Sequence, residues 1–315
     1  MSKSPFIFSA DNKRYHTLNY HNRTEYGRKI YKAVLDGGFS CPNIDGTKGT
    51  KGCIFCDGGS GYFTNGSLSV TAQLENEIKR IQDKHGNVPV IAYFQANTNT
   101  YAPVEKLRKM FFSVLDFPEV CGLSIGTRAD CLPVHIIELL NEINRKTILT
   151  VELGLQTIHE KTIEKINRCY THVEFCDGFY KLKEKNIRTC LHIINGLPYE
   201  TPEMMLETAH QIAIMQPDAL KIQMLHVIRG TELEKLYNSR KFVPLTKEEY
   251  INITVKQLEI LPPEIVIERI TGDGDKSKLI APIWSADKIS VLSGIDKRLA
   301  ELNTFQGKYF KKNLL

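Results

Sequence analysis

The sequence lacks any long apolar run. Its hydrophobic stretches are broken by charged residues or glycines within about ten positions, well short of the roughly eighteen apolar residues of a membrane-spanning helix. The first residues also lack the basic and apolar succession of a secretory signal. We therefore expect a cytoplasmic protein with no membrane association. No internal repeat or low-complexity tract is visible either, which argues against a repeat architecture.

The sequence also lacks a strong excess of charge of one sign. A net charge of +5 excludes few partners, and 315 residues with 42% hydrophobic content suffice for one large α/β domain with an appendage. Basic residues gather at the ends, since the first 40 residues hold seven Lys/Arg against three Asp/Glu and the tail GKYFKKNLL is basic again.

Basic and aromatic residues interleave between Asp11 and Lys32. Lysine and arginine neutralise phosphates and aromatic rings stack on unpaired bases, at about 1–3 kcal/mol per base, so this arm suits single-stranded RNA. Packing of its aromatic rings against the rest of the protein is an equally good interpretation. The residues concerned are Lys13, Arg14, Arg23, Arg28 and Lys29, with Tyr15, His16, Tyr20, His21, Tyr26 and Tyr31.

Eight cysteines without a secretory signal indicate reduced thiols and a metal site, not a disulfide framework. Cys41, Cys53 and Cys56 stand in the Gly- and Asp-rich segment 38–60, which has neither helical nor strand periodicity. We expect the others to be mostly small buried hydrophobic residues: Cys121, Cys131, Cys169, Cys176 and Cys190.

The number of cysteines in that segment is informative. A structural zinc ion takes four ligands, and an iron–sulfur cube normally takes four thiolates. Three thiolates on a [4Fe–4S] cluster leave one iron open to a ligand that is not protein. A zinc knuckle is the alternative, but no histidine or fourth cysteine lies within the segment, and the nearest downstream candidate is His85.

The remaining pattern predicts an α/β fold in which strands alternate with helices, which calls for a parallel sheet. Six such units are too few for a closed barrel, so we expect a partial, open (β/α)6 TIM-like barrel with a small C-terminal α/β cap. Residues 1–31 form the arm, 32–229 the barrel and 230–315 the cap. The strands are expected at 32–35, 88–94, 122–127, 147–155, 188–194 and 219–225, with a further strand, 266–270, in the cap.

Polar residues follow the predicted strands at their C-terminal ends, where the functional loops of such barrels lie. We expect them to face one mouth together with the cysteine segment. They are Gln95, Asn97, Asn99, Arg128, Asp130, Gln156, Thr157, Asn195, Gly196 and His226.

The three cysteines after a first strand, followed by the β/α series, resemble the radical S-adenosylmethionine (SAM) superfamily. Its common motif is Cys-x3-Cys-x2-Cys, whereas eleven residues separate Cys41 from Cys53 here. That spacing is characteristic of a subgroup with the radical domain of the Elongator catalytic subunit and the bacterial YhcC/YtqA (MnmL)-type proteins. The likeness runs from about residue 14 to 273 and includes KAVLDGGFSCPNIDGTKGTKGCIFCDGGSG, RYHTLN, SIGTRADCL, VELGLQT, HIINGLP and ERITGD.

The resemblance implies a [4Fe–4S] cluster on the three cysteines, SAM on the open iron, a 5′-deoxyadenosyl radical, and a reducing electron donor such as flavodoxin or ferredoxin. It implies Phe55 beside the adenine, and Arg168 on the SAM carboxylate. Many relatives carry Gly-Gly-Glu for the ammonium group, and its absence here leaves that role to Gln95 and Asn97. The other expected cofactor residues are Arg128, Glu152, Gln156, Asn195 and Leu197, although Glu152 and Arg128 are equally well explained as an interior ion pair.

For the substrate, the resemblance implies the C5 side chain of the tRNA wobble uridine in the anticodon loop, converted from carboxymethylaminomethyl to aminomethyl. Lys221 and Arg269 are expected to hold its carboxylate, with His226 as the third catalytic candidate. Arg128, Asp130 and His192 are expected to line the same mouth. The alternatives are a radical enzyme acting on a metabolite or a protein side chain, and a non-enzymatic, metal-containing RNA-binding module.

Overall fold

A computed structural model describes residues 6–58, 64–272 and 274–311. Gly59 and Ser60 of the predicted cysteine segment, Asp273 of the ERITGD motif and the last four residues of the basic tail lie outside the described residues. The chain forms two compact units. We call them the cysteine-loop unit, residues 27–154 and 168–190, and the C-terminal unit, residues 1–26, 155–167 and 191–315.

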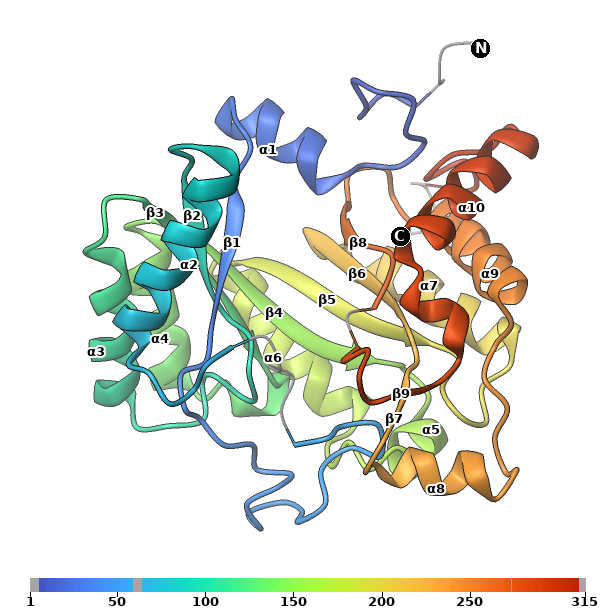
Figure 1. The fold of residues 1–315 in the computed structure, drawn as a ribbon, viewed down its shortest axis with the longest axis horizontal. Coiled ribbons are helices and arrows are strands. Elements are labelled where there is room, and N and C mark those ends of the chain that lie inside the picture. The colour runs from blue at the N-terminus through green and yellow to red at the C-terminus, as the bar shows by residue number, and fades with distance from the viewer. Residues whose placement is uncertain (1–5, 59–63, 273, 312–315) are drawn as a thin grey trace. The chain divides into compact units, whose positions relative to one another are not determined.

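The main sheet has seven strands in the order β1-β2-β3-β4-β5-β6-β8, so that β1 and β8 are its two outermost strands. The prediction of an open, sequence-ordered α/β sheet is therefore confirmed. The strands are β1 (Tyr31–Leu35), β2 (Val90–Phe94), β3 (Val120–Thr127), β4 (Ile148–Gln156), β5 (Arg188–Asn195), β6 (Ala219–Met224) and β8 (Val266–Arg269), as labelled in Figure 1.

The seventh strand corrects the predicted count of six. The apolar run that we expected in the cap pairs in parallel with β6, with Ala219 opposite Val266 and Lys221 opposite Arg269. The prediction of a strand here is confirmed. Its place in the main sheet was not predicted, because β8 has only four residues and follows helices that do not continue the β/α alternation. Its place in this sheet depends on pairing with β6, which cannot be inferred from the residues of β8 alone.

In the cysteine-loop unit, β1, β2 and β3 pair in parallel, and β3 pairs with β4 in the same sense. The helices of this unit are α2 (Val70–His85), α3 (Val104–Leu115), α4 (Val134–Asn144) and α6 (His172–Glu184), with a short 3₁₀ turn η1 (Ala129–Cys131). Helix α2 packs on β1 and α3 on β3 (Figure 1), because each buries an apolar stripe, such as Leu107, Phe111 and Val114 of α3.

Local signals in the sequence begin and end these helices. Ser69 caps α2 by accepting a hydrogen bond from the backbone of Ala72. Thr171 and Glu174 form a reciprocal capping box at the start of α6. Asn186 follows α6 with a φ of 52°, in the left-handed region expected of a residue that ends a helix.

The C-terminal unit contains α1 (Leu18–Tyr26), α5 (Glu160–Lys165), α7 (Pro202–Met215), α8 (Glu232–Asn238), α9 (Lys247–Ile260) and α10 (Lys288–Glu301). Helix α9 packs between α7 and α10. The strands β7 (Val227–Ile228) and β9 (Leu279–Ala281) form a separate antiparallel pair, followed by a 3₁₀ turn η2 (Ile283–Ala286). Helices α1 and α5 and the β7–β9 pair were not predicted, because each is too short or too polar to show a periodicity.

The N-terminal arm packs within the C-terminal unit. Tyr15 and His16 are buried, and Lys13 forms an ion pair with Asp296. The backbone carbonyl of His16 accepts from the amide of Ile267 in β8 at 2.7 Å. Packing therefore explains the front of the arm, whereas Arg23 and other residues from α1 onward are exposed.

Candidate active site

The three predicted cysteines lie on a turn-rich loop that follows β1. All are free thiols, partly exposed. The carbonyl of Cys41 accepts from the amides of Ile44 and Asp45 at 2.8 and 3.1 Å, and the amide of Cys56 donates to the carbonyl of Cys53 at 2.9 Å. These bonds form two tight turns that carry the thiols.

The thiols lie within electrostatic range of one another. Burial raises the pKa of Cys53 to about 12, and the charges of Cys56 and Cys41 add to that shift, while Arg128 opposes it. Burial also raises the pKa of Cys56, again with a contribution from Cys41. The side-chain amide of Asn43 donates to the sulfur of Cys53 at 3.6 Å. Three thiols that share one field, with an N–H directed at a sulfur, form a donor set suited to a metal cluster.

Arg128 is the fixed positive charge beside this loop. Its Nε and Nη2 donate to the two carboxylate oxygens of Asp130, each at 2.9 Å, and its Nη1 donates to the carbonyl of Arg168 at 3.0 Å. Burial opposes its charge, but the hydrogen bonds and charge of Asp130 hold the pKa of Arg128 above its ordinary value. The guanidinium also lies over the ring of Tyr170, 4.5 Å from its centroid.

Asp130 connects this group to the cysteine loop. Lys48, which lies between Cys41 and Cys53, forms an ion pair with Asp130 at 2.6 Å. The side chains of Asp130 and Arg128 are 3% and 10% exposed, whereas that of Lys48 is 35% exposed. The carboxylate therefore joins a buried guanidinium on one side to the half-exposed loop lysine on the other.

Arg168 continues the same network. It is almost fully buried, its Nε donates to the carbonyl of Tyr170 at 3.1 Å, and its guanidinium lies 4.2 Å from the Tyr170 ring centroid. The guanidinium groups of Arg128 and Arg168 therefore both lie near the ring of Tyr170. The resemblance implied that Arg168 grips a carboxylate, and the structure shows that its position is fixed by Tyr170.

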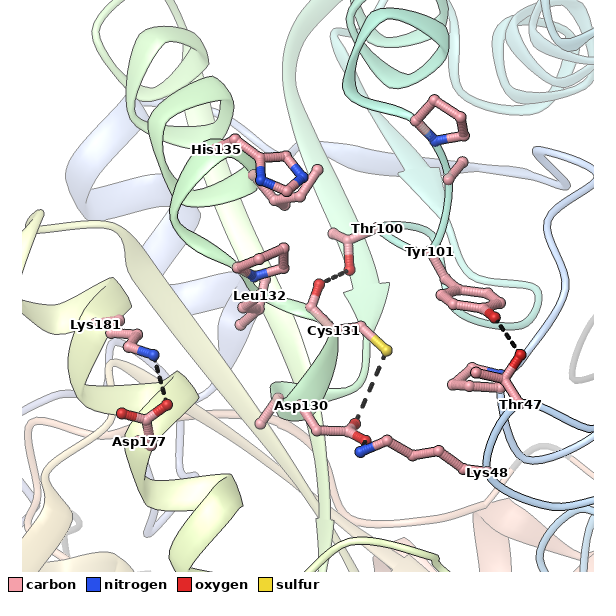
Figure 2. Close-up of a pocket in the computed structure, with 16 residues that line it drawn as sticks. Thr47, Lys48, Thr100, Tyr101, Asp130, Cys131, Leu132, His135, Asp177 and Lys181 are labelled. Carbon is pink, nitrogen blue, oxygen red and sulfur yellow. Dashed lines mark hydrogen bonds and ion pairs between the residues drawn. The ribbon is translucent and has the colours of Figure 1, made fainter.

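A pocket of about 640 Å³ opens beside the cysteine loop. Figure 2 shows Lys48 and Asp130 at its wall, with Tyr101 donating or accepting at Thr47 and Lys181 paired with Asp177. The wall also includes Cys131, whose pKa is raised by burial and by the charge of Asp130. The pocket joins residues from the cysteine loop, from the loops after β2 and β3, and from α6.

Glu152 on β4 is buried and fully engaged by the cysteine-loop unit. It accepts from Lys32 Nζ at 2.7 Å, from the Tyr93 hydroxyl at 2.7 Å and from the Ser124 hydroxyl at 2.6 Å. The predicted interior ion pair exists, but its cation is Lys32. The prediction of Arg128 as that cation is wrong, because Arg128 is held by Asp130.

The other expected cofactor residues of this unit lie at strand ends. Gln95 and Asn97 follow β2 and are half-buried, and Asn97 has a φ of 60°. Phe55 lies between two cysteines, also half-buried. Asn99 differs, because its amide donates to the carbonyls of Phe94 and Gly126 at 3.1 and 2.8 Å and so supports the loop itself.

In the C-terminal unit, Gln156 ends β4 with a φ of 54°. Its buried side-chain oxygen has no hydrogen-bond partner among the described residues, so it is available to a ligand donor. Asn195 and Gln257 instead exchange hydrogen bonds of 2.8 and 2.9 Å between their amides. The Asn195 side chain is therefore occupied by packing, and Leu197 is buried nearby in sequence.

Of the three expected catalytic residues, Lys221 is buried and lies 3.9 Å from Glu268. Arg269 is its neighbour across the β6–β8 pair and is half-buried. His226 follows β6, and burial together with the charge of Lys288 lowers its pKa to about 4. His192 lies on β5 and is half-buried.

Comparison with known proteins agrees with this arrangement. Residues 44–212 match the Radical SAM superfamily, and residues 217–301 match the Radical_SAM C-terminal domain. The chain is 46% identical to the uncharacterized protein YtqA of Bacillus subtilis over 99% of its length and 98% of that protein. It is 32% identical to protein YhcC of Escherichia coli K12, over 88% of this chain and 89% of that one.

This chain belongs to the radical SAM superfamily. Its fold is also that of an archaeal Elp3 from Methanocaldococcus infernus, with a TM-score of 0.65 at 16% identity, over 88% of this chain and 64% of that one. The predicted partial-barrel fold class and the suspected YtqA/YhcC relationship are confirmed. Among the described residues, no helix is both long and apolar enough to cross a bilayer.

The cofactors of the superfamily are a [4Fe–4S] cluster and SAM, and the site fits them. Three thiols on one loop are the kind of donor set that such a cluster needs, and Arg128 supplies a positive charge beside Cys41 and Cys53 that would offset the negative charge of thiolates. The zinc-knuckle alternative is thereby set aside. Such enzymes also need a one-electron donor.

Sequence reasoning missed several residues that form this site. Lys48 and Tyr170 hold the loop and the arginines, and Lys32, Tyr93 and Ser124 surround Glu152. Lys48 sits inside the cysteine segment and Tyr170 two residues after Arg168, so their proximity in sequence was a usable signal. The partners of Glu152 come from three different strands and gave no local signal.

Proposed function

We propose that this protein is a tRNA-modifying radical SAM enzyme that converts the carboxymethylaminomethyl group at C5 of the wobble uridine to aminomethyl. The observation that carries the proposal is the similarity to YtqA along nearly the whole chain, with the eleven-residue cysteine spacing of that subgroup. The subgroup resemblance supports tRNA as the substrate class, and the likeness to Elongator complex protein 3, 22% identical to the mouse protein, points the same way.

The reaction balances with the cofactors of the family. The bound cluster and SAM supply a 5′-deoxyadenosyl radical when reduced by one electron. Starting from the protonated secondary amine, removal of a hydrogen atom from the carbon next to the carboxylate, then of a proton from the nitrogen and of one further electron, gives an iminium. Water then releases protonated aminomethyluridine and glyoxylate. The side chain loses two electrons in total, and SAM gains two in becoming methionine and 5′-deoxyadenosine. The single electron that the substrate radical loses equals the single electron that the external donor supplies, so the reaction needs no net reductant.

The chain's own residues bind and orient these partners. We assign the cluster to Cys41, Cys53 and Cys56, and contacts to SAM to Phe55, Gln95 and Asn97. Because Arg128 and Arg168 are held by Asp130 and Tyr170, their part is to fix charge and geometry around the cysteine loop.

An anticodon loop suits such a site, because its bases are partly unstacked and one can be turned out at lower cost than from a duplex. The exposed basic residues Arg23, Arg28 and Lys29 of the N-terminal region are available to phosphates. We further propose flavodoxin or ferredoxin as the reductant and the cytoplasm as the location.

The test is mass spectrometry of tRNA nucleosides from cells with and without the gene, and from cells that carry Cys53→Ser. Deletion and C53S should both accumulate carboxymethylaminomethyluridine derivatives and lose the aminomethyl derivatives. Cys121→Ser, which replaces a thiol of β3 outside the predicted cysteine segment, is the matched control and should restore the normal profile. An unchanged nucleoside profile in the deletion strain would refute the tRNA substrate.

Purified enzyme gives a second readout. Anaerobic turnover with SAM and carboxymethylaminomethyl-containing tRNA should release one glyoxylate for each 5′-deoxyadenosine that depends on tRNA. Formation of 5′-deoxyadenosine without any tRNA product would favour a metabolite or protein side chain as substrate.

A further inference from the structure

The turn after β5 carries a tyrosine at a position that favours glycine. The amide of Glu200 donates to the carbonyl of Leu197 at 3.2 Å, which closes a four-residue turn with Pro198 and Tyr199 at its centre. Tyr199 has a φ of 73°, in the left-handed region. Proline in second place and a positive φ in third place fit a type II turn, whose third position favours glycine or asparagine because a bulky residue is strained there.

Burial does not explain the tyrosine at this position. Tyr199 is 51% exposed, so its ring contributes only part of its area to packing. The Nζ of Lys165 lies over the ring, 3.8 Å from its centroid, and a cation–π contact at an exposed site stabilises a protein only weakly. A strained residue that gains little from packing indicates a role in binding.

The turn and the lysine belong to the C-terminal unit and are both held in place by hydrogen bonds. The hydroxyl of Thr157, which is fully buried, donates to the carboxylate of Glu200 and accepts from the amide of His159 at 3.2 Å. The ring of His159, at the start of α5, donates to the carbonyl of Met204 in α7 at 2.8 Å. Lys165 ends α5. A ring on such a support loses little conformational entropy when it binds a ligand.

The position and chemistry of the pair indicate its ligand. Tyr199 follows β5, and Lys165 lies on the helix that follows β4, so both come after the carboxyl ends of strands, where the binding loops of such folds lie. An exposed aromatic ring stacks on an unpaired base, and a neighbouring lysine neutralises a phosphate of the same strand.

We propose that Tyr199 and Lys165 form a stacking platform for an unpaired base of the tRNA anticodon loop. This inference rests on the proposed function, since it concerns the RNA substrate of that reaction. The base lies on the exposed part of the Tyr199 ring, and the ammonium group of Lys165 neutralises a phosphate next to that base.

The experiment measures how tightly the reconstituted protein binds a synthetic anticodon stem-loop RNA and a fully paired RNA duplex. The wild type should bind the stem-loop more tightly, because the bases of the duplex are already stacked on one another. Tyr199→Gly removes the ring and should weaken binding of the stem-loop about ten-fold, with the duplex unchanged. Tyr199→Phe keeps the ring and should keep most of the affinity.

Urea unfolding separates this role from a structural one. Y199G should unfold at about the same urea concentration as the wild type, because relief of the strained φ offsets the greater freedom of glycine in the unfolded chain. If Y199G folds poorly, Tyr199→Asn takes its place, because asparagine also accepts a positive φ in this turn.

Lys165→Gln tests the cation of the platform. It should reduce the slope of log affinity against log salt for the stem-loop by about 0.7, the value for one phosphate contact on a single strand. Lys161→Gln is the matched control, because Lys161 is another exposed lysine of α5, and it should leave the slope unchanged. Tyr180→Ala is the control for the ring, because Tyr180 of α6 is 45% exposed, and it should leave both affinities unchanged.

Several results would overturn the platform. Unchanged binding of the stem-loop by Y199G would mean that no base stacks there, and equal weakening of both RNAs would mean that the turn acts on the RNA backbone. A lower urea midpoint in both Y199G and Y199N would assign the tyrosine to structure, and an unchanged salt slope in K165Q would remove the lysine.

The wild type distinguishes the two proposals. A wild-type protein that prefers the stem-loop while one of those results holds refutes only the platform. A wild-type protein that binds the stem-loop no better than the duplex contradicts the anticodon loop as substrate, and with it the proposed function.

Discussion

Asp130→Asn is the perturbation for which the structure gives the clearest expectation. The substitution keeps the size of the side chain and removes its charge. It leaves Arg128 one oxygen acceptor in place of the two carboxylate oxygens at 2.9 Å, and it removes the charge that pairs with Lys48 at 2.6 Å. Because the Asp130 and Arg128 side chains are 3% and 10% exposed, the guanidinium would be left without its counter-ion in a largely buried place.

The size of the effect follows from that burial. Removing one partner of a buried pair costs about 3–5 kcal/mol, whereas an exposed pair contributes about 0–1 kcal/mol. The remaining oxygen of asparagine still accepts one bond, so we expect a loss of about 3 kcal/mol in the free energy of unfolding. The loss should persist in 1 M salt, because buried charges are screened weakly.

Asp177→Asn is the matched control from the same pocket wall (Figure 2). Asp177 pairs with Lys181 at 2.6 Å, the same distance as Asp130 with Lys48, but these side chains are 63% and 40% exposed. We expect at most about 0.5 kcal/mol from this pair, and less in high salt. Because the two ion pairs have the same N–O distance and differ in exposure, a difference between the two variants measures the effect of burial.

The assay is urea unfolding of the two apoproteins, followed by circular dichroism at low and high salt, with iron retained after reconstitution as a second readout. D130N should unfold at clearly lower urea and retain less iron, because Lys48 no longer fixes the cysteine loop. Equal midpoints for D130N and D177N would show that the network around Arg128 does not support the loop, and the reasoning would fail.

Three further predictions concern other residues. Cys53→Ser should abolish the iron–sulfur absorbance while Cys121→Ser retains it, because only the first thiol belongs to the proposed ligand set. Glu152→Gln should lower the free energy of unfolding by about 3 kcal/mol through loss of its buried contact with Lys32, measured by urea unfolding. Burial lowers the pKa of His226 from 6.5 to about 4, so the unfolded chain takes up a proton first and the free energy of unfolding should fall as pH drops from 6.5 towards 4. The full effect is about 3 kcal/mol, and His226→Gln should remove that slope; an unaltered slope would mean that other groups cause it.

Much of the fold was predictable because its signals are local. Ser69 and Thr171 begin helices through their own side chains, and Asn186 ends one through its left-handed backbone. Helix α2, Val70–His85, likewise begins directly after its own capping residue. The place of β8 in the sheet was not predictable, because it depends on the pairing of Lys221 with Arg269 across two strands that are more than forty residues apart in sequence.

The site divides in the same way. The cysteines were predictable from their spacing, and Glu152 was identified as an interior charge, but its cation was not. Lys32 reaches Glu152 from β1 across the sheet, whereas the predicted partner Arg128 is captured by Asp130 two residues away. Arg128 pairs with an acid two positions away in sequence and not with the distant Glu152. The sequence offers both acids as partners, and only the structure shows which pair forms.

The bridge between Thr17 and Ile267 has a consequence for how the protein is made. It covers the outer edge of β8, and the side chain of Gln306 then accepts from the amide of His16 at 2.8 Å, so the beginning of the chain is held by one of its last residues. During synthesis on the ribosome, His16 and Thr17 cannot form these contacts until Ile267 and Gln306 have been added to the chain. The segments that carry the cysteines are complete long before that, so we expect their half of the molecule to fold first, while the N-terminal segment is still unattached.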